Sequence, residues 1–136
     1  MHTPSFITTY KQLSAEQKEK LDELIAQQDE KEEQLAELAA KLRTMPFSER
    51  DALEQEQDEF LERMCEEERE VDTAVYATDD PEEAFTLREM DYATLQEERY
   101  EVLTTSFPMG LDILENEIEQ IESEMRKVLP KPPGRR

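Results

Sequence analysis

The chain has 136 residues, which is enough for one domain with a modest hydrophobic core. Its 36 acidic and 16 basic side chains give a net charge of −20. Such a charge repels nucleic acids and anionic membranes, and it favours a protein partner with a basic surface. Two glycines are too few for a turn-rich β protein or for a glycine-rich phosphate-binding loop.

The sequence carries no targeting signal that we recognise. The N-terminal residues lack the basic and apolar regions of a signal peptide, and no stretch approaches the roughly 18 apolar residues of a membrane span. Cys65 is the single cysteine and cannot form an internal disulfide. We therefore expect a cytoplasmic protein that does not contact membranes.

The first helix is expected over residues 15–45, after an N-terminal arm of residues 1–13. Ser14 can cap the helix, and Gln17 can reach back to the Ser14 amide. Leucines spaced three and four residues apart then form an apolar stripe. Pro46 ends the helix, because proline lacks an amide hydrogen and disfavours helix in the residue before it.

The second helix is expected over residues 49–77, with Ser48 as its cap. A connection this short predicts that it lies antiparallel to residues 15–45, as a long hairpin that resembles a coiled coil. Two shorter helices should follow over 81–103 and 109–129.

Asp80 can cap the third helix, and Pro81 suits its first position. Residues 130–136 form a basic, proline-rich tail.

The sequence thus predicts an all-α fold with four helices in total, in a single domain over residues 14–129. The long antiparallel hairpin and the shorter helical pair can pack on each other as a bundle. Alternatively, each pair can associate with another chain. The apolar pattern leaves both arrangements open.

Glutamates crowd residues 62–70, which read ERMCEEERE, and Glu67 falls on the apolar stripe of its helix. Gln28 and Lys31 likewise replace apolar residues on the stripe of the first helix. An antiparallel alignment about Pro46 brings Gln28 close to Glu67. We therefore predict a polar layer of Gln28, Lys31 and Glu67 that fixes the register of the hairpin at a cost in stability.

The same stretch does not have the composition of a metal or catalytic site. The only histidine is His2, and Cys65 has no second thiol near it, whereas zinc needs about four ligands. Paired glutamates such as Glu56 and Glu59 have the spacing with which helical enzymes hold magnesium. Among 36 acids such matches arise by chance, and no basic phosphate-binding cluster accompanies them. We expect no enzyme activity, no metal and no cofactor.

Negative charge is concentrated in the middle of the chain. Residues 48–78 carry a net charge of −9 and residues 79–103 carry −7, against −3 for residues 1–47. This is about one net charge per 5 Å of helix, the same order as a DNA strand with one charge per roughly 3.4 Å. The partner-binding candidates on this acidic face are Glu56, Glu59, Glu62, Glu66, Glu68, Glu70, Asp72, Asp79, Asp80, Glu82 and Glu83.

We expect a non-enzymatic protein whose acidic face occupies a basic surface of a partner. The partner would be a nucleic-acid-binding protein, which the chain would inhibit as a nucleic-acid mimic. The alternative is a coiled-coil adaptor, chaperone or assembly scaffold that joins other chains, or a second copy of itself, through apolar heptad seams. The candidate oligomer seam is Leu111, Leu114, Ile118, Ile121, Met125 and Val128.

Overall fold

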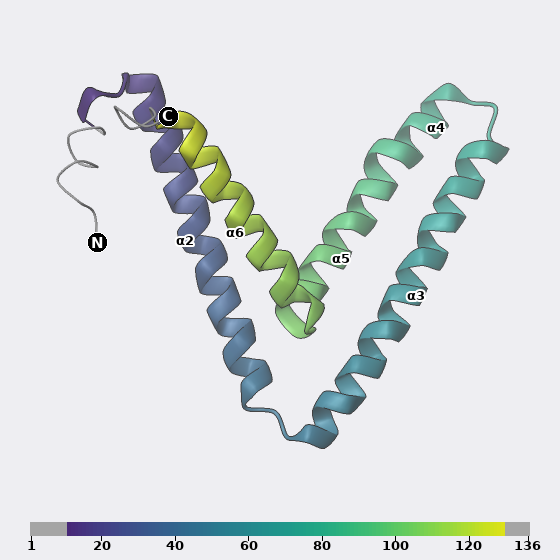
Figure 1. Cartoon of the computed structure of the whole chain (residues 1–136). Helices are drawn as coiled ribbons and strands as arrows, with labels where there is room; N and C mark the ends of the chain where they lie inside the picture. Colours follow the sequence, from purple (N-terminus) through teal and green to yellow (C-terminus); the bar gives the residue numbers. More distant parts are fainter. Residues whose placement is uncertain (1–10, 130–136) are drawn as a thin grey trace, which may run out of the picture. The chain divides into compact units, whose positions relative to one another are not determined.

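The computed structural model describes residues 11–129, so most of the expected arm and the whole tail lie outside the described residues. Between these limits the chain is helical and has no strand, which confirms the all-α fold (Figure 1). The elements are α2 (Ala15–Arg43), α3 (Phe47–Ala77), α4 (Pro81–Thr86), the π-helix η1 (Leu87–Asp91), α5 (Tyr92–Ser106) and α6 (Met109–Val128). Because α4, η1 and α5 follow without a break, the third expected helix is continuous but contains a π-helical segment.

Local capping chemistry explains where two of the helices begin. The Ser14 amide donates to Gln17 Oε1 at 2.9 Å, and the Gln17 amide donates to Ser14 Oγ at 3.1 Å. This reciprocal pair is the capping box that the sequence predicts. Asp80 Oδ1 accepts from the Glu82 amide at 3.0 Å, with proline at the next position, as expected.

The start of α3 differs from the prediction. Pro46 occupies the N-cap position without a side-chain cap, and the helix begins at Phe47 instead of after Ser48. Arg50 donates from Nε and Nη2 to the Leu42 carbonyl oxygen, at 2.9 and 2.6 Å. A guanidinium group therefore satisfies a carbonyl at the end of α2 and closes the α2–α3 turn.

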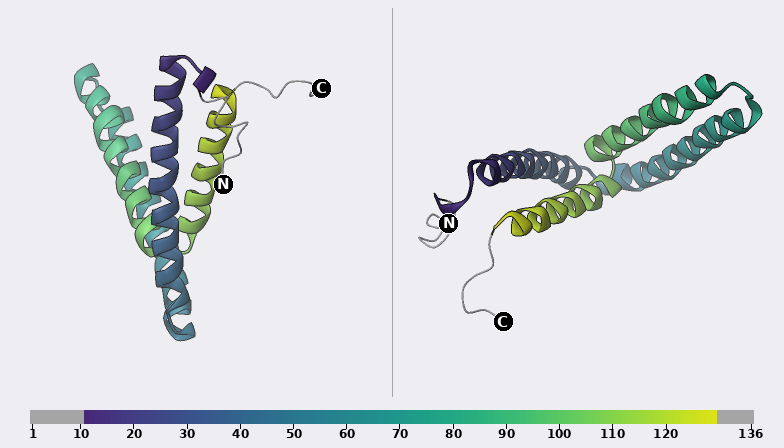
Figure 2. Two further views of the ribbon diagram at one scale, coloured as in Figure 1. Left: turned by 90° about the vertical axis from the view of Figure 1, so that its left-hand side faces the viewer. Right: turned by 90° about the horizontal axis from the view of Figure 1, so that it is seen from above.

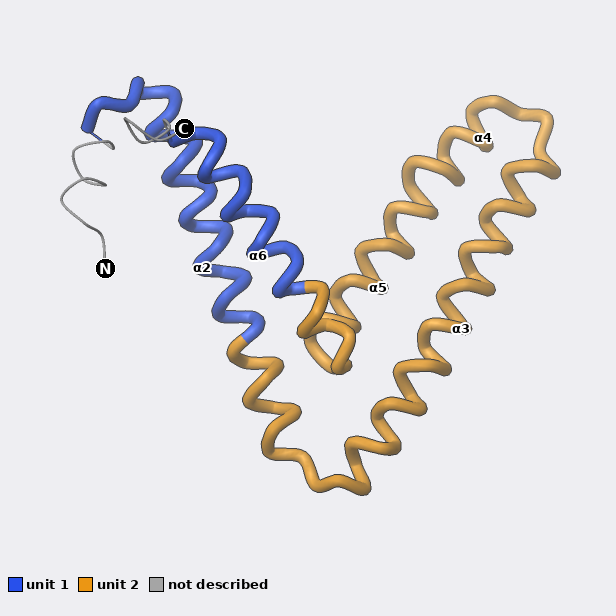
Figure 3. The backbone as a smooth tube through the Cα atoms, viewed as in Figure 1, with its two compact units in different colours: residues 1–35, 114–136 blue, residues 36–113 orange. Residues whose placement is uncertain are grey.

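The chain divides into two compact units (Figure 3). Unit 1 comprises residues 1–35 and 114–136, and within it α2 lies antiparallel to α6 (Figure 2). The buried apolar side chains of this unit come from both helices and from Leu13, which precedes α2: Leu13, Leu21, Leu24, Leu114, Ile118 and Ile121. The heptad spacing in α6 thus forms one side of a core within the chain.

Unit 2 comprises residues 36–113, and in it α3 runs beside α4, η1 and α5 (Figure 1). Its core cluster is Phe60, Met64, Leu103 and Phe107, and the two phenylalanine rings stack with centroids 5.6 Å apart. Gly110 lies against the end of α5, where the backbone of Leu103 leaves no room for a Cβ atom. The core of unit 2 therefore sits at the base of the α3–α5 hairpin.

Antiparallel helix pairs are present within each unit. The paired partner of α3 is the run of α4, η1 and α5, and α2 bonds to α6 through Gln28 and Lys31. Connection length constrains only the residues next to a turn. Along the rest of a helix the partner is chosen by the best match of apolar stripes, and α6 carries the most regular stripe of the chain.

Candidate functional site

Ten of the eleven residues of the acidic face are exposed, and Glu68 is the exception. All eleven belong to unit 2, on α3, in the α3–α4 connection and in the first turn of α4. Glu59, Glu62, Glu66 and Glu70 follow one another at three or four residues, so they share one side of α3. At about 1.5 Å per residue, successive residues on this side are roughly 4.5–6 Å apart along the helix axis.

Glu68 has a structural contact instead of a free carboxylate. Its Oε1 accepts from Gln96 Nε2 at 2.9 Å and lies 3.6 Å from Nη1 of Arg99. Both partners are on α5, so these three side chains connect α3 to α5 outside the core cluster of unit 2. Its carboxylate is therefore engaged within unit 2, and we do not expect Glu68 to contact a partner.

The other carboxylates of the acidic face are not neutralised by recorded ion pairs. Among the ion pairs of residues 11–129, Arg99–Glu68 involves the acidic face, whereas Lys31–Glu117 and Lys127–Glu124 do not. Asp80 and Glu83 serve the α3–α4 connection, since Asp80 caps α4 and Glu83 Oε2 accepts from Thr78 Oγ1 at 2.9 Å. The glutamates along α3 therefore present their charge to solvent.

Gln28 and Lys31, two members of the predicted polar layer, contact α6. Gln28 Nε2 donates to Glu122 Oε1 at 3.1 Å, and Lys31 Nζ lies 3.1 Å from Glu117 Oε2. Both acceptors are on α6, so the sequence named the wrong helix for Gln28 and Lys31. Glu67, the predicted third member, lies on α3 in unit 2. It is half-buried and lines a groove between α3 and η1. The polar contacts of Gln28 and Lys31 therefore join α2 to α6.

The candidate oligomer seam is largely covered by the chain itself. Leu114 is fully buried, and Ile118 and Ile121 expose less than a tenth of their surface. Leu111, Met125 and Val128, the remaining members, are half-buried. A second copy would find little free apolar surface on the middle of this stripe.

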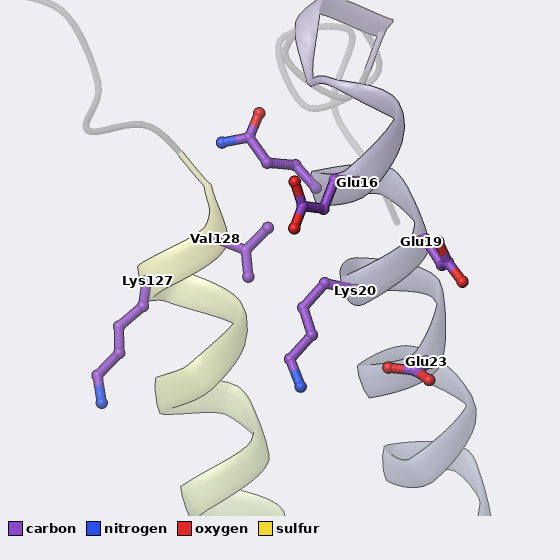
Figure 4. A pocket seen from close by; sticks show the side chains of 7 residues that line it. Glu16, Glu19, Lys20, Glu23, Lys127 and Val128 are labelled. Carbon is purple, nitrogen blue, oxygen red and sulfur yellow. The ribbon is translucent and has the colours of Figure 1, made fainter.

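A groove of about 470 Å³ lies between the start of α2 and the end of α6, within unit 1 (Figure 4). Figure 4 shows Lys20 and Val128 pointing into the space between the helices, whereas Lys127 points away. Lys127 instead lies 3.3 Å from Glu124. With glutamates and lysines together on its walls, this groove offers no charge preference for a ligand.

No group of three or more acidic, histidine or cysteine side chains is placed to hold a metal ion among residues 11–129. Cys65 is exposed and forms no disulfide. In the same part of the chain, no helix combines the length and the apolar character needed to cross a bilayer.

The π-helical segment is the feature that sequence analysis missed. The Tyr92 amide donates to the Leu87 carbonyl, five residues earlier, in place of the usual four. Leu87 and Leu95 both line one groove beside α3 although they are eight residues apart, one more than a heptad. At about 100° per residue, positions eight apart are offset by roughly 80° in a regular α-helix, and the π turn removes much of that offset.

Comparison of the chain with protein-family models, with curated proteins and with solved structures finds no match.

Proposed function

We propose that this is a non-enzymatic binding protein whose acidic face docks on a basic surface of a partner protein. In its sharper form, the partner is a nucleic-acid-binding protein of the cytoplasm, and the chain inhibits it by occupying the surface that binds the nucleic acid. The observation that carries the proposal is the row of exposed glutamates on α3, none of which forms a recorded ion pair within residues 11–129.

The charge distribution supports a localised surface over a uniform one. Residues 1–47 contain nine acids and six bases, whereas residues 48–78 contain twelve acids and three bases. A charge that served solubility alone would need no such asymmetry. A one-sided field attracts a basic partner over distances up to about a Debye length, roughly 8 Å at physiological salt, and raises the association rate.

The alternative of an assembly scaffold joined through α6 has less support. The middle of that seam is buried within the single chain, so association through it would first require unit 1 to open.

The proposal is tested by reversing charges on α3 and repeating the same change elsewhere. The test variant carries Glu59→Lys, Glu66→Lys and Glu70→Lys. The control carries Glu19→Lys, Glu30→Lys and Glu33→Lys on α2, where all three positions are also exposed. Both variants have the same net charge, so a difference between them reports position alone.

The measurement is capture of partners from a lysate of the native host at low salt, followed by release with salt and competition with DNA or RNA. We expect the wild type and the α2 variant to retain basic nucleic-acid-binding proteins that salt and nucleic acid displace. The α3 variant should lose them. Equal loss or equal retention by the two variants would show that the position of the acidic face does not matter, and the proposal would be wrong.

A further inference from the structure

The outer part of the α3–α5 hairpin contains no fully buried residue. From Cys65 to Val102 every side chain is exposed or half-buried, whereas Met64 and Leu103, which flank this range, expose only 1% of their surface. We call residues 65–102 the distal hairpin. Its apolar residues do not form a buried core of their own, so they are available to contact a helix of another protein.

A groove of about 490 Å³ runs between α3 and the η1–α5 segment of the distal hairpin. Its apolar lining is Val71 and Ala74 from α3, with Leu87 and Leu95 from the opposite side. Small side chains on α3 explain the hollow, since valine and alanine do not reach across to the facing helix. Glu67, Glu70 and Asp91 line its edge.

The π-helical segment builds this groove. A π turn widens the helix and adds one residue, so that Leu87 at its start and Leu95 after it both line the groove beside α3. Thr94 donates through Oγ1 to the Met90 carbonyl at 2.8 Å, beside the π turn. A helix distortion of this kind is tolerated where it aims side chains at a binding site.

Large apolar side chains also stand exposed around the distal hairpin. Tyr76 exposes 91% of its surface, and Phe85 and Met90 are exposed by more than half. Aromatic residues in such positions are typical anchors of protein interfaces.

Charge decides what kind of partner fits. The distal hairpin carries 14 acidic and three basic side chains, a net charge of −11. A second copy of the chain would bring an equal charge against it, and this repulsion disfavours a homodimer. A helix that combines apolar side chains with lysine or arginine complements both the lining and the rim of the groove.

We propose that the groove between α3 and η1–α5 receives one amphipathic, basic helix of the partner protein. Apolar side chains of that helix, spaced at i, i+3 or i+4 and i+7, enter the lining formed by Val71, Ala74, Leu87 and Leu95. Its basic side chains meet Glu67 and Glu70 at the rim. The inference rests on the proposed basic partner and adds that an apolar anchor, in addition to charge, recognises it.

The probe is a pair of synthetic peptides of about 18 residues, or roughly five helical turns. The first has leucine at the anchor positions and lysine on its flanks. The second has the same lysines but alanine at the anchor positions. Binding of each labelled peptide is followed by fluorescence anisotropy at low and high salt, and the helicity of each protein variant is checked by circular dichroism.

We expect the leucine peptide to bind more tightly, and Leu87→Ala and Leu95→Ala each to weaken it about tenfold. That factor corresponds to the loss of about two methylene groups from an apolar contact. Thr73→Ala is the control, since Thr73 is exposed on α3 but does not line the groove, and it should leave the affinity unchanged. Independently of any variant, the methyl NMR signals of Val71, Leu87 and Leu95 should shift on titration of the wild type.

The outcomes separate this inference from the proposed function. If both peptides bind equally, lose affinity with salt and ignore the groove variants, recognition is by charge alone. The inference is then overturned while the proposed function stands. If neither peptide binds at low salt, both are contradicted. If the protein dimerises through the groove, so that Leu87→Ala yields a monomer, a second copy is the occupant and the inference is overturned.

Discussion

Replacing Gly110 by alanine should destabilise unit 2, although alanine is the better helix former. An ideal Cβ atom at this position would lie 2.7 Å from the Leu103 carbonyl carbon and from Thr104 Cα. Non-bonded carbon atoms prefer about 3.5–4.0 Å, so α5 and α6 would have to separate by about 1 Å where they meet. Backbone atoms cannot rotate away as a side chain can.

Overpacking of this kind costs about 1–3 kcal/mol, and the higher helix propensity of alanine returns up to about 1 kcal/mol. We therefore expect a net loss of about 1–2 kcal/mol, which lowers the melting temperature by about 4–8 °C for a chain of this size. Thermal unfolding followed by far-ultraviolet circular dichroism measures it.

Asn116→Ala is the control for this experiment, because Asn116 is exposed on the same helix and alanine should there be neutral or slightly stabilising. A Gly110→Ala protein that melts at or above the wild-type temperature would refute the reasoning. It would mean that the contact between α5 and α6 at Leu103 leaves room for a Cβ atom at position 110.

Four further results are expected. Ser14→Ala should lower the free energy of unfolding in urea by about 1 kcal/mol, because it removes half of the capping box, whereas Ser48→Ala should change nothing since Ser48 caps no helix. Ile118→Asp should unfold unit 1, seen as lost helicity, and a variant that stays folded but changes its mass in light scattering would instead support an oligomer seam. Phe60→Ala should cost about 3–5 kcal/mol, and an undisturbed melting curve would contradict its place in the core cluster. Added sodium chloride should raise the melting temperature, because it screens the repulsion among side chains with a net charge of −20, so a flat response would show that this repulsion is negligible.

Helix starts were predictable from the sequence where they depend on neighbouring residues. Ser14 with Gln17, and Asp80 with Pro81, form their contacts within a few residues, and the structure contains both. The exposure of the glutamates on α3 was also predictable, because they lie on the side of the helix away from its apolar stripe. The all-α fold and most of the acidic face are therefore local properties of the sequence.

The partners of polar side chains depend on residues far apart in the chain, and the partner predicted for Gln28 was wrong. Gln28 was assigned to Glu67 because the α2–α3 connection is short, yet its bonding partner is Glu122, 94 residues away. Glu68 was counted as a free carboxylate because its partners Gln96 and Arg99 are 28 and 31 residues further on. One sequence contains many equivalent polar pairs, and only the packing of the apolar faces selects among them.

The position of the core cluster at the base of the α3–α5 hairpin sets a gradient of stability along it. Separating α3 from α4 and η1 exposes no fully buried side chain until the opening reaches Met64 and Leu103. We therefore expect such an opening to require less free energy than global unfolding. Amide hydrogens of the distal hairpin should exchange first, and their rates should rise steadily from the core cluster towards the α3–α4 turn. The hairpin is thus held at one end by its core cluster, and we expect the distal hairpin to adjust to the shape of a bound partner.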